Sequence, residues 1–214
     1  MSLPTYFDSP VKLTMLRTAA ARVIGTPFFA NSEAPGRDGG LDCVHTLNWV
    51  YRFCGAISHI AIPRQHMDAG AHADRSILID AFETWPVLHS RFALVWKKSS
   101  EFQVPGSEIP SALQPFSPSV LRPGDALCFL AGKVPHHGGI LLEHGEFLHC
   151  LRGDGVHTMH LDAVLRGWKP LGLVTAVYRP LPLPVGAAVP GSEFGVSSSP
   201  AADAAWVGTV NSKP

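Results

Sequence analysis

The sequence has little charge, no long basic run and no long apolar run. Only 16% of its 214 residues are charged, against about 25% in a typical soluble protein. The 17 basic and 17 acidic residues cancel, and the longest run of positive charge is the pair Lys97 and Lys98. Nucleic acid and anionic membrane surfaces are therefore poor candidate partners.

Targeting and membrane-spanning patterns are also missing. The residues that follow Met1 lack the basic and apolar regions of a secretory signal, and no later stretch has the length of a membrane span. We therefore expect no membrane span, and a protein that is cytoplasmic or is released by a route without a signal peptide.

Cysteine is scarce and shows no paired spacing. The four cysteines contain no C-x-x-C pair and are too few for a disulfide framework in a chain of this length; they are Cys43, Cys54, Cys128 and Cys150. We expect all four to be reduced.

The chain is long enough for one sizeable core, and 46% of its residues are apolar. After Arg179 it becomes rich in Pro, Gly, Ala and Ser. We expect a single domain over residues 1–180 and a flexible tail over 181–214, with Trp206 as the only candidate anchor in that tail.

The first half of the chain reads as helices and the second half as strands. Ser9 and Pro10 mark the start of a helix that Gly25 ends, and its predicted inner face is Leu13, Leu16, Ala20, Val23 and Ile24. Further helices are predicted over 43–54, 76–85 and 161–168, and strands over 126–130, 138–142, 146–151 and 173–178, while 90–97 is either a strand or a helical turn. Helices followed by strands favour an α+β fold, with N-terminal helices packed on a C-terminal antiparallel sheet.

A cysteine stands at the start of the second predicted helix. Asp42 is a favoured N-cap residue, and Leu47, Val50 and Tyr51 recur at helical spacing after Cys43. A thiol at this position lies among unpaired backbone N–H groups at the positive end of the helix dipole, which favours the nucleophilic thiolate. Taken alone, however, a single cysteine near a helix start is more often an inert packing residue.

Histidines gather in the strand region. If residues 143–145 form a three-residue hairpin loop with Gly145 in the left-handed conformation, Leu142 pairs with Glu146. His149 then lies opposite Gly139 and diagonal to His137, on the same face of the sheet. A two-residue turn would instead place His136 on the face of His149.

Five short motifs in a fixed order resemble the NlpC-type cysteine peptidases, a papain-like family. The motifs are Gly25-Thr26-Pro27-Phe28, Gly40-Leu41-Asp42-Cys43, Pro123-Gly124-Asp125, His137-Gly138-Gly139-Ile140 and Phe147-Leu148-His149. The resemblance implies a papain-like fold for the chain and an amide-cleaving cysteine hydrolase that uses no cofactor. It also implies that Cys43 is the nucleophile, His137 its general base and His149 the residue that orients His137. The substrates implied are peptides, including peptidoglycan fragments.

The sequence departs from the family pattern at three places. Val44 and His45 replace the Ser-Gly that commonly follows the Asp-Cys pair, and Phe28 replaces an upstream tyrosine. The interval of 94 residues between Cys43 and His137 is also longer than in compact members. We therefore expect an insertion around residues 56–119 that walls or covers the groove.

Two other interpretations remain open. One is a zinc-binding module, because residues 136–160 are rich in His and include Cys150, although no recognised metal-ligand spacing is present. The other is a papain-like relative that transfers an acyl group, or that binds a ligand without catalysis.

Overall fold

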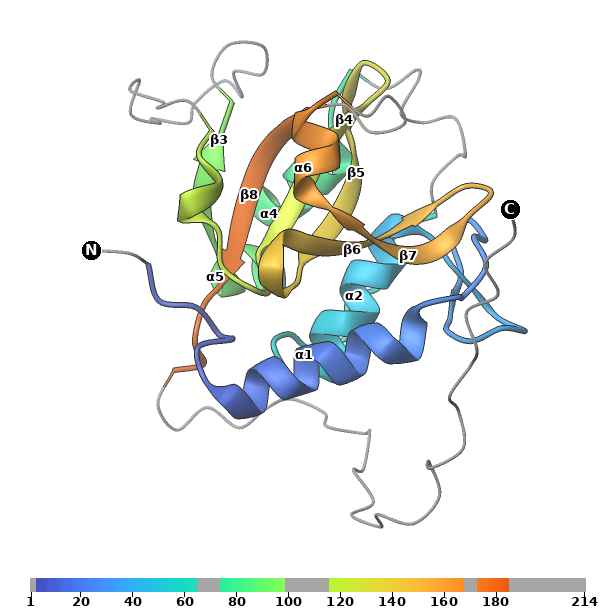
Figure 1. Cartoon of the computed structure of the whole chain (residues 1–214), viewed down its shortest axis with the longest axis horizontal. Coiled ribbons are helices and arrows are strands. Elements are labelled where there is room, and N and C mark those ends of the chain that lie inside the picture. Colours follow the sequence, from blue (N-terminus) through green and yellow to red (C-terminus); the bar gives the residue numbers. More distant parts are fainter. Residues whose placement is uncertain (1–2, 65–73, 99–115, 168–172, 185–214) are drawn as a thin grey trace, which may run out of the picture.

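The computed structural model describes residues 3–64, 74–98, 116–167 and 173–184 (Figure 1). The helices are α1 (Pro10–Val23), α2 (Cys43–Phe53), α4 (Ile77–Thr84), α5 (Pro86–Arg91) and α6 (Leu161–Leu165), with 3-10 turns η1 (Pro118–Val120) and η2 (Glu143–Gly145). The strands are β1 (Glu33–Ala34), β2 (Gly40–Leu41), β3 (Phe92–Lys97), β4 (Ala126–Ala131), β5 (Val134–Leu141), β6 (Glu146–Leu151), β7 (Gly155–His160) and β8 (Val174–Pro180). No helix among these is long and apolar enough to cross a membrane.

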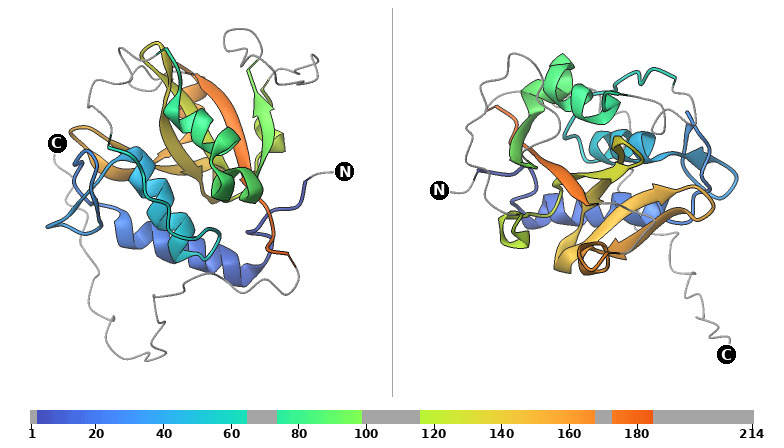
Figure 2. Two further views of the ribbon diagram at one scale, coloured as in Figure 1. Left: turned by 180° about the vertical axis from the view of Figure 1, so that it is seen from behind. Right: turned by 90° about the horizontal axis from the view of Figure 1, so that it is seen from above.

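One antiparallel sheet forms the centre of the fold, with the strand order β3-β8-β4-β5-β6-β7. The helices α1, α2 and α4 lie on one side of the sheet, and α6 lies on the other (Figures 1 and 2). β1 and β2 form a separate two-stranded sheet just before α2. The α+β class, with N-terminal helices packed on an antiparallel sheet, is confirmed.

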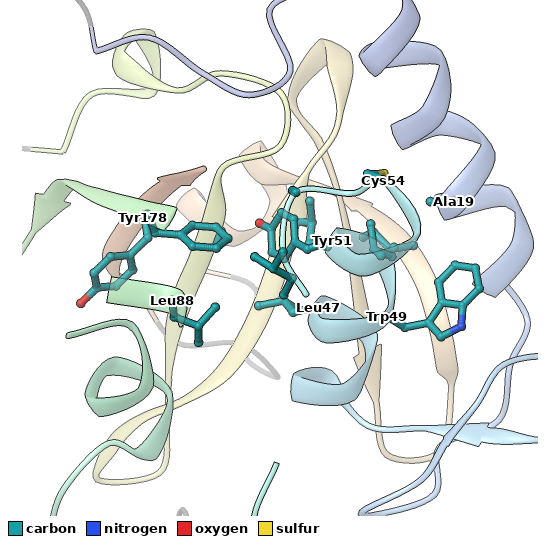
Figure 3. Close-up of a cluster of buried hydrophobic side chains, with 14 of the residues drawn as sticks. Ala19, Leu47, Trp49, Tyr51, Cys54, Leu88 and Tyr178 are labelled. Carbon is teal, nitrogen blue, oxygen red and sulfur yellow. The ribbon is translucent and has the colours of Figure 1, made fainter. Parts of the chain in front are cut away.

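The two faces of the sheet carry two apolar clusters because side chains alternate along each strand. The helix-side cluster joins residues of α1, α2, α4 and α5 to sheet residues such as Ile140 and Leu148. Figure 3 shows part of it, including Leu47 and Tyr51 of α2 and Tyr178 of β8. The second cluster contains Phe129 and Phe147 together with residues of α6.

Local signals set most of the helix boundaries. The Ser9 hydroxyl accepts a hydrogen bond from Lys12 N–H at the start of α1, and Gly25 has a φ of 83° just beyond its end. The buried face of α1 includes Ala19, whereas Ile24, which we expected to be inside, is 48% exposed. The reason is that Ile24 is the C-cap residue and its backbone is no longer helical.

Three elements extend or decide what the sequence predicted. Pro86 does follow the end of α4, but it also opens α5 at the first helical position, where a missing N–H costs nothing. Residues 90–97 contain strand β3, so the strand alternative is correct. β7 was not predicted, because its side chains beyond Val156 are polar or only half-buried and so do not alternate clearly.

Parts of the predicted insertion and tail lie outside the described residues. These are 65–73 and 99–115 within the predicted insertion, and 185–214, which includes Trp206.

Candidate active site

Cys43 is the first residue of α2, as expected. Asp42 is the N-cap, and its carboxylate accepts hydrogen bonds from the backbone N–H of His45 and of Asn31. Burial alone would raise the pKa of Asp42, but the hydrogen bonds from His45 and Asn31 outweigh burial and hold it below its ordinary value. An ionised carboxylate therefore lies directly beside the candidate nucleophile.

The Cys43 thiol lies against the edge of β5 next to His137. Its sulfur is 3.8 Å from the His136 carbonyl oxygen and faces the Gly138 N–H. Leu141 directs its N–H and carbonyl towards the β4 side, so by the alternation of an antiparallel ladder Gly138 directs its N–H towards the β6 side.

The ladder between β5 and β6 ends at the pair Gly139 and His149. Cys43 therefore occupies the part of the β5 edge that β6 leaves uncovered. The two main-chain groups that it faces, on residues 136 and 138, flank His137 along the strand.

The predicted hairpin is confirmed in its register. Gly145 has a φ of 77°, and Leu142 N–H donates to the Glu146 carbonyl at 2.7 Å. Gly139 lies opposite His149, and His137 Nε2 is 3.1 Å from His149 Nδ1. The three-residue loop thus brings the two predicted histidines together on one face.

The histidine pair is buried among aromatic rings of the second cluster. His137 is 7% exposed and His149 is fully buried, and Phe129 and Phe147 pack against them. Within the described residues, no hydrogen bond joins the His137 ring to Cys43, and Nδ1 of His137 has no hydrogen-bond partner. That nitrogen therefore has the capacity to accept a proton.

Electrostatics favour neutral side chains at this site. Burial lowers the pKa of His137 to about 3, with further lowering by His136 and His157. Burial also lowers the pKa of His149 to about 3, and His137 and His157 add to this effect. The resting imidazoles are therefore neutral and able to accept protons.

The thiol is neutral at rest as well. Burial raises the pKa of Cys43 to about 12, and the Asp42 carboxylate adds to the rise, whereas N–H groups of Gly138, Val44 and Cys43 itself oppose it. This differs from the expected thiolate, because the helix-start N–H groups act against both burial and the charge of Asp42. Cys43 is still the only half-exposed cysteine, since Cys54, Cys128 and Cys150 are buried.

Two further features were not found from the sequence. His45, in the first turn of α2, is buried, and its Nδ1 is 2.8 Å from Asp42 Oδ1, so it helps to hold the N-cap. His157 packs its ring 4.3 Å from the His149 ring, on the strand β7 that was not predicted. The contact between Asp42 and His45 could have been predicted from the sequence, because a histidine follows the acidic N-cap residue by three positions.

The structure also bears on the metal interpretation. Among the described residues, no group of three or more His, Cys, Asp or Glu side chains is arranged to hold a metal ion. The histidines of residues 136–160 instead make separate contacts, such as that of His137 with His149 and that of His160 Nε2 with the His144 carbonyl at 2.9 Å.

The sequence motifs outside Cys43, His137 and His149 also have defined places in the structure. Gly25 N–H and the Thr26 carbonyl bond to Val156 of β7, and Pro27 and Phe29 bond to Leu41, so the first loop is fixed beside Cys43. Asp125 of the Pro-Gly-Asp turn forms a two-point ion pair with Arg179 of β8. These contacts connect the N-terminal loop and the last strand to the sheet.

No family model matches the sequence, and no curated protein matches it. Among solved structures, NlpC1 from Trichomonas vaginalis is similar over 82% of this chain and 46% of its own, at 15% identity and a TM-score of 0.45. An NLP/P60 family protein from Staphylococcus aureus is similar over 83% and 44%, at 18% identity and a TM-score of 0.43.

The chain thus spans less than half the length of these two proteins. The NlpC/p60 domain of the peptidoglycan hydrolase SagA is similar over 79% of this chain and 98% of its own, at 15% identity and a TM-score of 0.40. These three solved structures carry NlpC, NLP/P60 or NlpC/p60 in their names, which is the family that the sequence motifs resemble.

Proposed function

We propose that this chain is a cysteine hydrolase that cleaves amide bonds in peptides of the peptidoglycan type, with Cys43, His137 and His149 as its catalytic site. The observation that carries the proposal is the position of the half-exposed thiol. It lies at the main-chain edge that flanks His137, and His137 in turn meets His149 at 3.1 Å. These positions support the assignment of Cys43 as the nucleophile, His137 as the base and His149 as the group that orients the base.

In the proposed mechanism, His137 Nε2–H donates to His149 Nδ1 and leaves His137 Nδ1 free to accept the thiol proton. The sulfur attacks the substrate carbonyl as this proton leaves, so a neutral pair becomes a nucleophile and an imidazolium only during reaction. The imidazolium then protonates the departing amine. Water next attacks the thioester carbonyl while neutral His137 takes its proton, and the carbon–sulfur bond breaks as that proton passes to the departing Cys43 sulfur.

Backbone N–H groups supply the stabilisation of the oxyanion. The N–H groups of Cys43 and Val44 at the start of α2 already face the sulfur. Negative charge that develops on the carbonyl oxygen beside this sulfur would lie near the same helix start, where donors are fixed in advance.

The proposal treats residues 1–180 as one catalytic unit. The element order joins α1 and α2 to strands that end at Pro180, and Tyr6 N–H bonds to the Pro180 carbonyl at 2.7 Å, so the two ends of this range meet. The region proposed as an insertion contributes α4, α5 and β3 to the helix-side cluster and the sheet edge.

The test is mass spectrometry of soluble peptidoglycan fragments incubated with the full chain. We expect new peptide ends that differ from the substrate by one water, and none with Cys43→Ala, whose melting temperature should match the parent. If both proteins release identical products, or neither releases any, the hydrolase proposal is wrong. Transfer of the peptide to an added amine without hydrolysis would favour the acyltransferase alternative.

A further inference from the structure

A third histidine ring continues the pair formed by His137 and His149. β6 lies between β5 and β7 in the sheet (Figure 1), and His157 of β7 is the direct cross-strand partner of His149. The two ring centres are 4.3 Å apart, and the rings are tilted by 58° to one another. The three histidines thus form a row across three adjacent strands, in which His137 and His149 are buried and His157 is half-buried.

One nitrogen of this row has no partner. His149 is fully buried, and its Nδ1 meets His137 Nε2 at 3.1 Å, whereas its Nε2 makes no hydrogen bond within the described residues. Phe147 also packs on the His149 ring, but its side chain offers only carbon atoms. A buried ring nitrogen without a partner is costly, and His157 is the polar ring that contacts the same imidazole.

The main chain fixes which nitrogen of His157 carries a hydrogen. Its Nδ1 lies 3.1 Å from the Gly155 carbonyl oxygen. Because a carbonyl oxygen only accepts, Nδ1 is the donor, and in an uncharged imidazole the other nitrogen, Nε2, then holds a lone pair. His157 therefore offers an acceptor to its neighbour. The last torsion of a histidine side chain is soft, so rings in contact need only a small rotation, or one bridging water, to join this Nε2 to His149.

Two proton arrangements are open to the pair of His137 and His149. In the first, His137 Nε2–H donates to His149 Nδ1, so His149 carries its own proton on Nε2 and His137 Nδ1 holds a free lone pair. In the second, His149 Nδ1–H donates to His137 Nε2, and His137 Nδ1 then carries a proton and cannot accept another. An acceptor beside His149 Nε2 stabilises the first arrangement only.

We propose that His157 is a positioning residue that accepts a hydrogen bond from His149 Nε2–H and so holds His137 in the tautomer with a free Nδ1. The inference rests on the proposed function, because it explains how His137 is kept able to take the proton of Cys43. In this role His157 touches neither the substrate nor the reacting atoms. It acts through His149, since the hydrogen bond made by one nitrogen of an imidazole sets the protonation of the other.

The direct test is nitrogen-15 NMR of the histidine rings at pH 7. Burial lowers the pKa of both His137 and His149 to about 3, so both rings are neutral at that pH. The spectrum distinguishes a ring nitrogen that carries a proton from one that holds a lone pair, and His137→Gln and His149→Asn identify the signals. We expect a proton on Nε2 and a lone pair on Nδ1 in both rings. A proton on Nδ1 of either ring in the parent would overturn the proposal.

Three variants separate the acceptor of His157 from the packing of its ring. His157→Phe keeps a planar ring without an acceptor, and we expect His137 and His149 to shift together towards the form with a proton on Nδ1. His157→Gln keeps a side-chain acceptor and should keep the tautomers of the parent. The matched control is His89→Phe, the same change at an exposed position of α5, which should leave them unchanged. Unchanged tautomers in His157→Phe would overturn the proposal.

Turnover gives an independent readout. His157→Phe should lower kcat about two- to tenfold, the usual effect of one hydrogen bond, and leave KM unchanged, and His157→Gln should restore most of the loss. An equal loss in both variants, or a change in KM alone, would contradict a role through the acceptor. If the parent cleaves no amide, the hydrolase proposal fails, whereas the spectra of the parent and of His157→Phe still decide whether His157 sets the tautomer of the pair.

Discussion

Two buried polar pairs of the sheet differ in how completely they are bonded: Asp125 and Arg179 join the turn before β4 to β8, and His137 and His149 join β5 to β6. Arg179 donates to both carboxylate oxygens of Asp125 at 2.8 Å and also to the Leu3 and Val120 carbonyls. The pair of His137 and His149 has a single hydrogen bond of 3.1 Å, and Nε2 of His149 has no partner in the described part of the chain.

The comparison separates a pair that holds elements of the fold together from the pair that we propose acts in catalysis. A fully bonded ion pair has no capacity left for a substrate, and it fixes β8 against the turn before β4. A neutral pair with free nitrogens can exchange a proton. Its buried nitrogens without partners lower the stability of the fold, and the other interactions of the fold offset that loss. We therefore expect a change in the ion pair to act mainly on stability and a change in the histidine pair to act mainly on activity.

The largest effect on stability should follow from breaking the ion pair. Arg179→Met leaves the Asp125 carboxylate buried without its partner, and we expect a loss of about 3–5 kcal/mol in the free energy of unfolding. The matched control is Arg17→Met, which breaks the exposed surface pair of Arg17 with Glu143 and should destabilise the protein far less, because solvent screens that pair. Urea unfolding of both variants gives the measurement, and equal losses would remove the distinction.

A change in the histidine pair should act mainly on turnover. His149→Asn keeps a polar side chain but alters the support of His137, and we expect kcat to fall roughly ten- to hundredfold. A purely structural role for His149 would instead lower the melting temperature at pH 7 and leave kcat of the folded fraction unchanged.

The same variant has a signature in the pH dependence of stability. The pKa of His149 is about 3 in the folded protein, against about 6.5 in an unfolded chain, so the unfolded chain binds the proton first as the pH falls. Stability is thus lost between those two values on acidification, and His149→Asn removes this contribution. Between pH 7 and pH 4.5 the melting temperature of the variant should fall by several degrees less than that of the parent; parallel curves would show that His149 is not buried in its neutral form.

A further expected effect concerns the resting thiol. Because the pKa of Cys43 is raised to about 12, its alkylation by iodoacetamide should rise about tenfold per pH unit from pH 6 to 9. The modified residue is identified by peptide mapping, with Cys43→Ala as the control. A plateau across this range would reveal a resting thiolate and imidazolium pair, contrary to the neutral pair described here.

The sequence was sufficient for features that depend on neighbouring residues. The N-caps at Ser9 and Asp42 and the register of the hairpin at Gly145 follow from side-chain and turn chemistry within a few residues, and the hairpin register brought His137 and His149 together. Strand β7 escaped detection because its half-polar side chains gave no clear alternation.

Contacts between distant segments could not be predicted in the same way. The position of Cys43 at the uncovered end of β5 depends on packing over dozens of residues. The neutral thiol is a further case, because burial overrides the helix-start effect that the local sequence indicates.

The central claim is that His137, and not its neighbour His136, is the general base for Cys43. The carbonyl of His136 meets the thiol, but its ring has a buried Nδ1 without a partner in the described residues and no hydrogen bond to His149. Single-turnover hydrolysis of one peptide amide by His137→Ala and His136→Ala, each matched to the parent in melting temperature, tests this most directly. We expect His137→Ala to lose about a hundredfold to ten-thousandfold in rate and His136→Ala to stay close to the parent; an inactive His136→Ala beside an active His137→Ala would contradict the account.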